Sequence, residues 1–151
     1  MKHVKKVQFL FGILILLNIG CSNNDPQPSA KESLQNALAN STWIIDEASS
    51  DITGVSGAPD IAGVTISFTK STPGASFTFG GEISTLIFGG EFDINPDGTI
   101  ANAMLEVDES LLVNDLVITA TETFCRISFT TGSASGRVEG IGSYVLTFLA
   151  N

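Results

Sequence analysis

Short runs of alternating apolar and polar residues fill most of the chain after residue 40. In the run 64–69, Val64, Ile66 and Phe68 alternate with threonine and serine. A period of two is typical of a strand with one buried and one solvated face. The other runs of this kind cover residues 43–48, 76–79, 86–94, 101–107, 125–130 and 144–148. We therefore expect about eight strands in the chain.

Clusters of turn-forming residues separate these runs. Glycine, proline, asparagine or aspartate gather at residues 71–74, 80–81, 95–98 and 131–133. Short strands joined by tight turns predict an all-β fold, either an antiparallel up-and-down barrel or a β-sandwich. Gly89 and Gly90 fall inside a run, which indicates a bulge or a tight bend there.

A short helix is predicted before the first strand. Ser29 and Glu32 have the spacing of a capping box, in which each side chain binds the other residue's backbone N–H. Leu34, Ala37 and Leu38 then fall on one face of a helix over 30–39.

The first twenty residues have the pattern of an export signal. Residues 1–6 contain three lysines and no acid, and residues 7–17 are apolar except for Gln8 and Gly12. A basic segment followed by a short apolar one is typical of a secretory signal. The apolar segment is shorter than the roughly 20 residues that a membrane-spanning helix needs.

The end of this segment resembles the lipobox of bacterial lipoproteins. Gly20 and Cys21 match that motif, whereas Asn18 stands where the family usually has Leu, Val or Ile. The polar residues 22–25 are similar to the start of many Bacteroidetes surface lipoproteins. The resemblance implies that residues 1–20 are removed and that Cys21 is acylated. The protein would then be anchored by lipid to the outer membrane, on its periplasmic or surface-exposed side. The alternative is an ordinary cleaved signal.

The resulting domain plan has three parts. Residues 1–20 are the signal peptide, the polar and proline-containing residues 21–29 form a tether, and residues 30–151 form a single β-domain.

Removal of the signal leaves a strongly acidic chain. Only four basic residues remain against sixteen acids, a net charge of −12. The surface would repel the phosphates of nucleic acid, so nucleic-acid binding is not expected. His3 is the chain's one histidine and leaves with the signal, which argues against a Ser-His-Asp relay and a histidine zinc site. Cys125 then has no disulfide partner, and we expect it to be buried and inert. We expect no enzyme activity and no cofactor.

Three segments of the β-domain resemble small lipocalin-like barrels. They are residues 38–43, which end in Trp43, the strand–turn–strand segment 92–100 and the closing segment 142–148. The resemblance implies a barrel with Trp43 at one end and a basic residue, Arg126 or Arg137, stacked on it. It also implies a small apolar ligand inside the barrel. The residues expected to line that ligand site are Trp43, Phe68, Phe77, Phe79, Phe88 and Phe92.

Two interpretations of the function stay open. The first is a lipocalin-like barrel that binds a small apolar ligand, which a cavity lined by the phenylalanines would favour. The second is a structural or adhesin-like envelope protein that binds another protein, which a solid core with an exposed strand edge would favour. The protein partner is not indicated by the sequence.

Residues 93–98 allow two readings. Asp93, Asn95 and Asp97 match the first half of an EF-hand calcium loop. Such a loop also needs an acid at position twelve, which here is Met104. Asn-Pro-Asp-Gly is also a strong type I turn, and we prefer this interpretation to a metal site.

Overall fold

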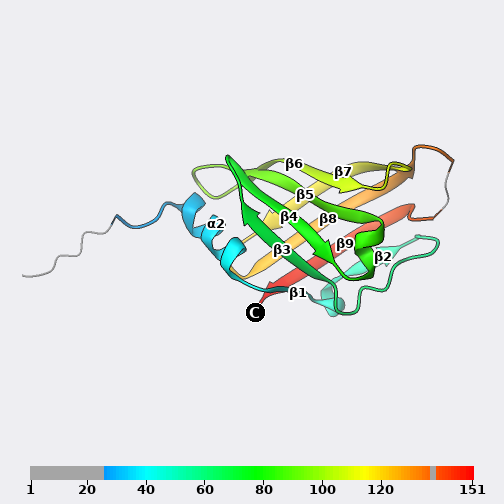
Figure 1. Cartoon of the computed structure of the whole chain (residues 1–151), viewed down its shortest axis with the longest axis horizontal. Coiled ribbons are helices and arrows are strands. Elements are labelled where there is room, and N and C mark those ends of the chain that lie inside the picture. Colours follow the sequence, from blue (N-terminus) through cyan, green and yellow to red (C-terminus); the bar gives the residue numbers. More distant parts are fainter. Residues whose placement is uncertain (1–25, 137–138) are drawn as a thin grey trace, which may run out of the picture.

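The computed structural model describes residues 26–136 and 139–151, and Figure 1 shows one helix leading into an antiparallel β-structure. Helix α2 spans Ala30–Asn40, and two 3-10 helices, η1 (Glu47–Ser49) and η2 (Glu82–Thr85), connect strands. The strands are β1 (Trp43–Ile45), β2 (Asp51–Thr53), β3 (Thr65–Lys70), β4 (Gly74–Gly80), β5 (Ile87–Ile94), β6 (Ile100–Val107), β7 (Leu111–Ala120), β8 (Phe124–Ser133) and β9 (Gly142–Ala150).

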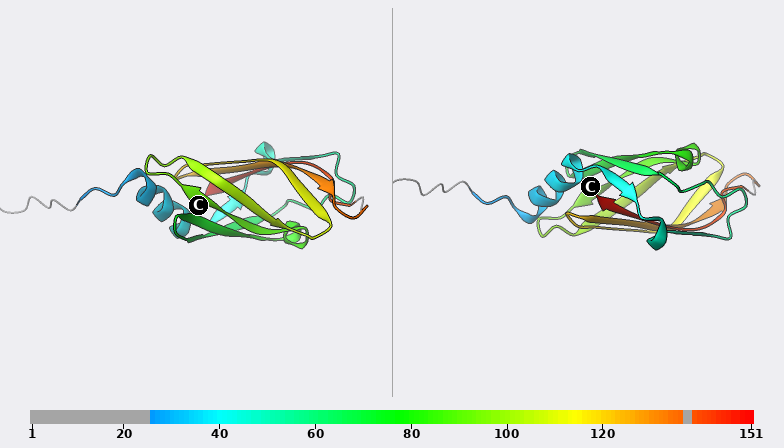
Figure 2. Two further views of the ribbon diagram at one scale, coloured as in Figure 1. Left: turned by 90° about the horizontal axis from the view of Figure 1, so that it is seen from above. Right: turned by 90° about the horizontal axis from the view of Figure 1, so that it is seen from below.

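The strands form one sheet that curls into a nearly closed, flattened barrel (Figure 2). The order in the sheet is β6-β5-β4-β3-β1-β9-β8-β7, every pairing is antiparallel, and β2 pairs with the free part of β9. The predicted all-β barrel of about eight strands after a short helix is therefore confirmed, and the sandwich alternative is wrong. The two ends of the order, β6 and β7, meet at the place where the barrel would close.

Helix α2 covers one end of this barrel. It begins with the predicted capping box, since the backbone N–H of Glu32 donates to Ser29 Oγ at 3.2 Å and the Glu32 carboxylate accepts from the Ser29 N–H at 2.9 Å. Leu34 and Leu38 are buried from this helix. Gln35 Nε2 also donates to the carbonyl oxygens of Ser71 and Gly74, which ties the helix to the β3–β4 turn.

The alternation predicts seven of the barrel strands, β1, β3, β4, β5, β6, β8 and β9, but not β7. Only Leu111 and Ile118 of its ten residues are buried. The strand carries an extra residue near Asp115, so the alternation changes phase in its middle. A strand with neither a buried face nor a constant phase gives no period-two pattern.

A bulge in β5 overturns one prediction about the barrel interior. The pairing of β5 with β6 passes from Ile87–Val107 to Gly89–Glu106, so Phe88 is the extra residue. Phe88 therefore points outward and is 46% exposed, instead of lining the interior. Gly89 and Gly90 mark the predicted irregularity: a Cβ atom at these positions would collide with the backbone carbonyls of Phe77 and Met104.

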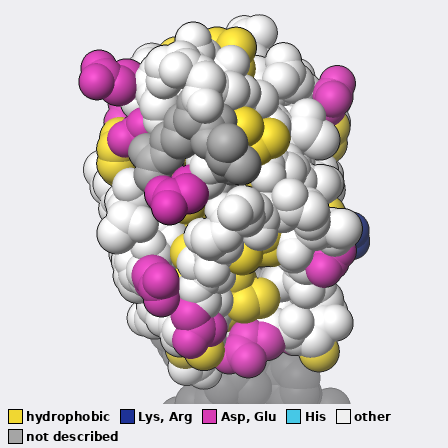
Figure 3. Space-filling view, turned by 90° about the vertical axis from the view of Figure 1, so that its right-hand side faces the viewer, with side chains coloured by type: hydrophobic (Ala, Val, Ile, Leu, Met, Phe, Trp, Pro, Cys, Tyr) yellow, Lys and Arg dark blue, Asp and Glu magenta, His cyan; other side chains and the backbone are white. Residues whose placement is uncertain are grey.

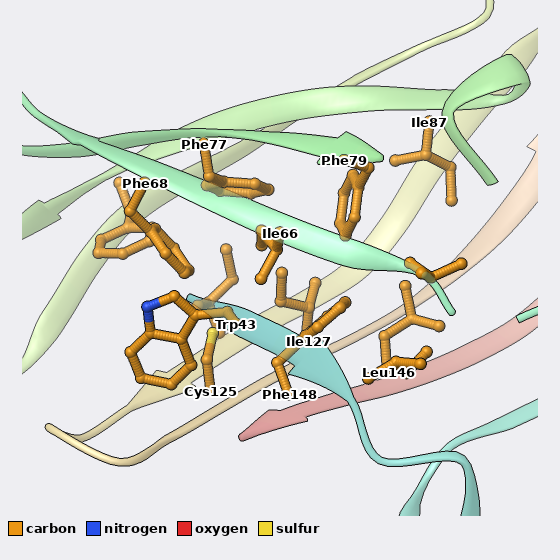
Figure 4. Packing of buried hydrophobic residues seen from close by; sticks show 14 of the residues in the cluster. Trp43, Ile66, Phe68, Phe77, Phe79, Ile87, Cys125, Ile127, Leu146 and Phe148 are labelled. Atoms are coloured by element: carbon orange, nitrogen blue, oxygen red, sulfur yellow. The ribbon is translucent and has the colours of Figure 1, made fainter. Parts of the chain in front are cut away.

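Aromatic side chains of β1, β3 and β4 pack together inside the barrel, as Figure 4 shows for Trp43, Phe68, Phe77 and Phe79. The ring centroid of Phe68 lies 5.6 Å from Trp43, 5.8 Å from Phe77 and 6.2 Å from Phe92. These separations are those of rings in contact. Toward the other end, the rings of Phe129 and Tyr144 are stacked with centroids 4.7 Å apart.

Candidate functional site

The predicted interior site is a packed cluster of rings. Trp43, Phe68, Phe77, Phe79 and Phe92 are all buried and lie together, whereas Phe88 is outside. Within the cluster the rings touch one another, and Trp43 Nε1 donates to the carbonyl oxygen of Leu38 at 3.0 Å. This geometry stabilises the fold, and binding of an apolar ligand among these rings stays a prediction.

The basic residue expected over Trp43 is not Arg126. That side chain is exposed on the outer face of β8, while its neighbour Cys125 faces the core. The edge of Phe68 takes the place against the indole. Arg137, the other candidate, lies outside the described residues.

Cys125 is a structural residue. It is fully buried, and this burial raises the pKa of its thiol to about 12. A thiol with that pKa stays protonated and unreactive at neutral pH.

Residues 93–98 form the predicted turn. The backbone N–H of Gly98 donates to the Asn95 carbonyl at 2.9 Å, and Asp97 Oδ1 accepts from the backbone N–H and the hydroxyl of Thr99. These bonds lower the pKa of the exposed Asp97 carboxyl.

The side chain of Asp93 takes no part in the hydrogen bonds of this turn. Its Oδ2 accepts from Asn102 Nδ2 on β6 at 2.7 Å. Asn95 and Asp97 thus share Thr99 as a hydrogen-bond partner within the turn, whereas Asp93 binds Asn102. Within residues 26–136 and 139–151, no three acidic, cysteine or histidine side chains gather as a metal site would require.

The unclosed part of the barrel provides a second candidate site. β6 and β7 are consecutive strands, yet in the described residues no ladder of hydrogen bonds joins them. They diverge from their connecting turn toward the end covered by α2 (Figure 2, left). A groove of about 260 Å³ lies between them, lined by Ala103, Met104, Leu105, Val113 and Leu116. A second hollow of about 200 Å³ follows it along Ile100–Ala103 and Leu116–Ile118.

The turn that joins the two strands is held firmly. Leu111 N–H donates to the Asp108 carbonyl at 2.9 Å, and Asp108 N–H donates to the Leu86 carbonyl at the same distance. Ser110 N–H donates to Asp108 Oδ1 at 3.0 Å. The strands therefore separate although their connection is fixed.

A bulge in each strand explains why they separate. β6 has an extra residue at Asn102 opposite β5, and β7 has one at Asp115 opposite β8. Both residues have a left-handed backbone, with φ of 48° and 54°. Asn102 is bound to Asp93 on β5, and Asp115 Oδ2 accepts from Thr130 Oγ1 on β8 at 3.2 Å. Each bulge is thus fixed to its own side of the gap, and bulges of this kind prevent regular pairing of edge strands.

The surface around the groove is unusually apolar for a solvated face. Six large apolar side chains of the described residues are exposed: Ile44, Phe88, Met104, Leu112, Val117 and Leu149. Four of these six lie on β5, β6 and β7. Inward-facing Leu105 and Leu116, which a closed barrel would bury, are only half-buried.

The same face is acidic. β5, β6 and β7 contain no lysine or arginine. Exposed Glu91, Glu106 and Asp115 stand on these strands, and Glu109 lies in the turn after β6. The barrel end at which that turn lies, shown in Figure 3, has acidic side chains around its rim with apolar atoms between them. On the neighbouring strand β8, the basic residue Arg126 pairs with Thr119 of β7.

Sequence reasoning did not find this groove. Its signal was present in residues 111–120, where Asn114-Asp115 interrupts an otherwise apolar run. An asparagine or aspartate inside a strand is compatible with the left-handed backbone of a bulge.

Comparisons with known proteins add no family. Neither protein-family models, nor curated proteins, nor solved structures contain a match to this chain. Among the described residues, no helix has the length and apolar character needed to cross a membrane.

Proposed function

We propose that this protein is a lipid-anchored envelope protein whose β-barrel binds another protein at the groove between β6 and β7. The observation that carries the proposal is the contrast between a barrel interior occupied by aromatic rings and two bulged strand edges with exposed apolar side chains. Contiguous exposed apolar surface is a common feature of protein-binding sites.

The anchoring part of the proposal rests on the sequence. The basic and apolar segments before Cys21 and the match of Gly20-Cys21 to a lipobox support acylation at Cys21. These residues lie outside the described part of the chain. Ser29 is the N-cap of α2, and α2 lies at one end of the barrel. A tether at 21–29 would therefore connect to the β-domain at that end.

A small apolar ligand is the second candidate occupant. The groove of about 260 Å³ with its lining of Leu105, Val113 and Leu116 supports it, because apolar walls suit an apolar molecule. The groove is open along its length and has no buried polar group to orient such a ligand, so we favour the protein partner.

Site-specific photo-crosslinking in the host envelope tests the proposal. A photo-reactive amino acid replaces Met104 in the groove, or Leu149 on the outer face of β9 as the control of similar exposure. We expect a protein adduct from position 104 and none from position 149. A lipid-sized adduct at position 104 would support the carrier function instead. Absence of any adduct specific to position 104 would overturn both.

A separate experiment tests the anchor. The Cys21→Ala chain should lose its acyl groups and leave the membrane fraction, because stable anchoring needs the acyl chains. If the Cys21→Ala chain still sediments with membranes, the lipoprotein interpretation is wrong.

A further inference from the structure

We infer that the partner presents an extended, lysine- or arginine-containing segment that adds a strand to the free edge of β7. This inference rests on the proposed function, since it names the chemistry of the partner that binds at the same groove.

The backbone of β7 provides the edge. Beyond the Asp115 bulge, β7 pairs with β8 from Val117–Ser128 to Ala120–Cys125. Among the described strands, none pairs with its other side, because β7 ends the sheet order. A strand with one paired side presents a row of backbone N–H and C=O groups on the other. The hollow along Leu116–Ile118 lies on that side and leaves space beside the edge.

The two faces of an added strand would meet different surroundings at this edge, one apolar and one acidic. Successive side chains of a strand point to opposite faces. One set would point inward, onto the half-buried Leu105, Val113 and Leu116. The other set would point outward, beside Met104 and Val117 and toward the acids on β5 and β6. An alternating apolar and charged segment satisfies both faces.

The negative charge of this face favours a positively charged partner segment. Glu91 lies directly opposite Met104 in the β5–β6 pairing, and exposed Glu106 lies on β6 next to the groove. Because β5, β6 and β7 carry no cation of their own, these carboxylates are available to lysine or arginine on the added strand. A second copy of this acidic chain would meet like charges at the groove, which disfavours self-association.

Peptide binding to the purified chain in nanodiscs of zwitterionic phosphatidylcholine tests the inference. The probe is a fluorescein-labelled seven-residue peptide that alternates lysine and valine, and fluorescence anisotropy reports its binding. Empty nanodiscs are the blank. We expect saturable binding that weakens roughly tenfold when lysine is replaced by glutamate, because the acidic groove repels that peptide.

Two further comparisons separate strand pairing from charge alone. A lysine–valine peptide that is methylated at every backbone nitrogen keeps its charge but lacks N–H donors on both edges, so it should bind about tenfold more weakly if pairing matters. Double substitution Glu91→Gln with Glu106→Gln should weaken binding several-fold, whereas the control Glu47→Gln with Glu82→Gln removes the same charge elsewhere and should not.

The outcomes are distinct from those of the crosslinking experiment. Equal binding of the N-methylated peptide, or equal effects of the two double substitutions, would overturn the added strand. No peptide binding together with a protein adduct at position 104 would overturn the inference and leave the proposed function standing. A change to dimeric chain in mass photometry without peptide would show that a second copy fills the groove, and would also overturn it.

Discussion

Regular strand pairing is interrupted at two places in the barrel, and the two interruptions differ in what covers them. At the first, β1 is only three residues long and pairs with β3 through Trp43 and Ile44. Helix α2 covers the remainder of β3, and Trp43 and Leu38 are completely buried there. At the second, β6 and β7 face each other with no helix between them and with half-buried leucines. We call these the α2 seam and the β6–β7 seam.

The difference shows how backbone groups and apolar side chains can be satisfied without a strand. At the α2 seam, Ile45 N–H donates to the Val64 carbonyl, Asp46 N–H donates to the Thr147 carbonyl, and Asn151 N–H donates to the Thr42 carbonyl. A few backbone hydrogen bonds and the buried Trp43 side chain therefore replace a regular ladder of hydrogen bonds at this seam. At the β6–β7 seam, bulges keep the edges apart and leave them accessible. One seam is completed by the chain itself, and the other suits completion by a partner.

The largest effect is expected from opening the α2 seam. Trp43→Ala removes a fully buried ring that contacts Phe68 and binds the Leu38 carbonyl. We expect the free energy of unfolding to fall by about 3–5 kcal/mol. Urea denaturation followed by circular dichroism measures it. A loss below about 1 kcal/mol would mean that Trp43 does not seal this end.

Alkaline pH should report how well the core beside this seam excludes water. Cys125, which lies near Trp43 in Figure 4, has its pKa raised by burial from 9.0 to about 12. Its contribution to stability is complete below pH 9 and is lost as pH rises from 9 toward 12, because the unfolded thiol ionises first. At pH 10 the loss is about 1.4 kcal/mol relative to pH 8.

Denaturation at pH 8, 9 and 10 for the native chain and for Cys125→Ala measures this loss. The variant should show a flatter pH dependence over this range. Burial also raises the pKa of Tyr144, whose ordinary value is 10.0, so this group contributes near pH 10 in both chains and cancels in the comparison between them. Parallel pH curves for the two chains would contradict the assignment.

A smaller effect is expected at the β6–β7 seam. Leu105→Ala removes an apolar side chain that is only half-buried and lines the open groove. Water can enter the space, so no sealed cavity forms, and we expect a loss of about 1 kcal/mol. Leu38→Ala at the α2 seam is the matched comparison, with about 2–5 kcal/mol expected. Equal losses at both leucines would show that the two seams are closed equally well.

The smallest effect is expected on the rim of the groove. Met104→Lys places a charge at a side chain that is 58% exposed. Stability should change by no more than about 0.5 kcal/mol, since a solvated substitution disturbs no core contact. Thermal melting measures this change. A large loss would indicate that Met104 is covered in the folded chain, against the open groove described above.

The strands that keep a constant alternation over most of their length are predictable from the sequence, and the strand whose phase changes in the middle is not. The capping box at Ser29 and the alternation through Val64, Ile66 and Phe68 each reflect a local rule that the fold obeys. Phe88 was placed inside because a bulge, which no alternation reveals, shifts its phase. The alternation does not reveal β7, because the bulge at Asp115 shifts the phase in the middle of the strand. The groove is not evident from the sequence, because one of its two walls is β7, whose alternation is interrupted.

The bulges at Asn102 and Asp115 would also limit the stoichiometry of the assembly that we propose at this site. An open sheet edge can recruit strand after strand, because each addition creates a new edge, and fibres grow in this way. Here the two edges face each other across a gap that is fixed at one end by the Asp108 turn. A strand that enters has β6 on one side and β7 on the other, and offers no edge to the next. If the proposed partner strand binds there, the same geometry that leaves the barrel incomplete would limit the assembly to a single added strand.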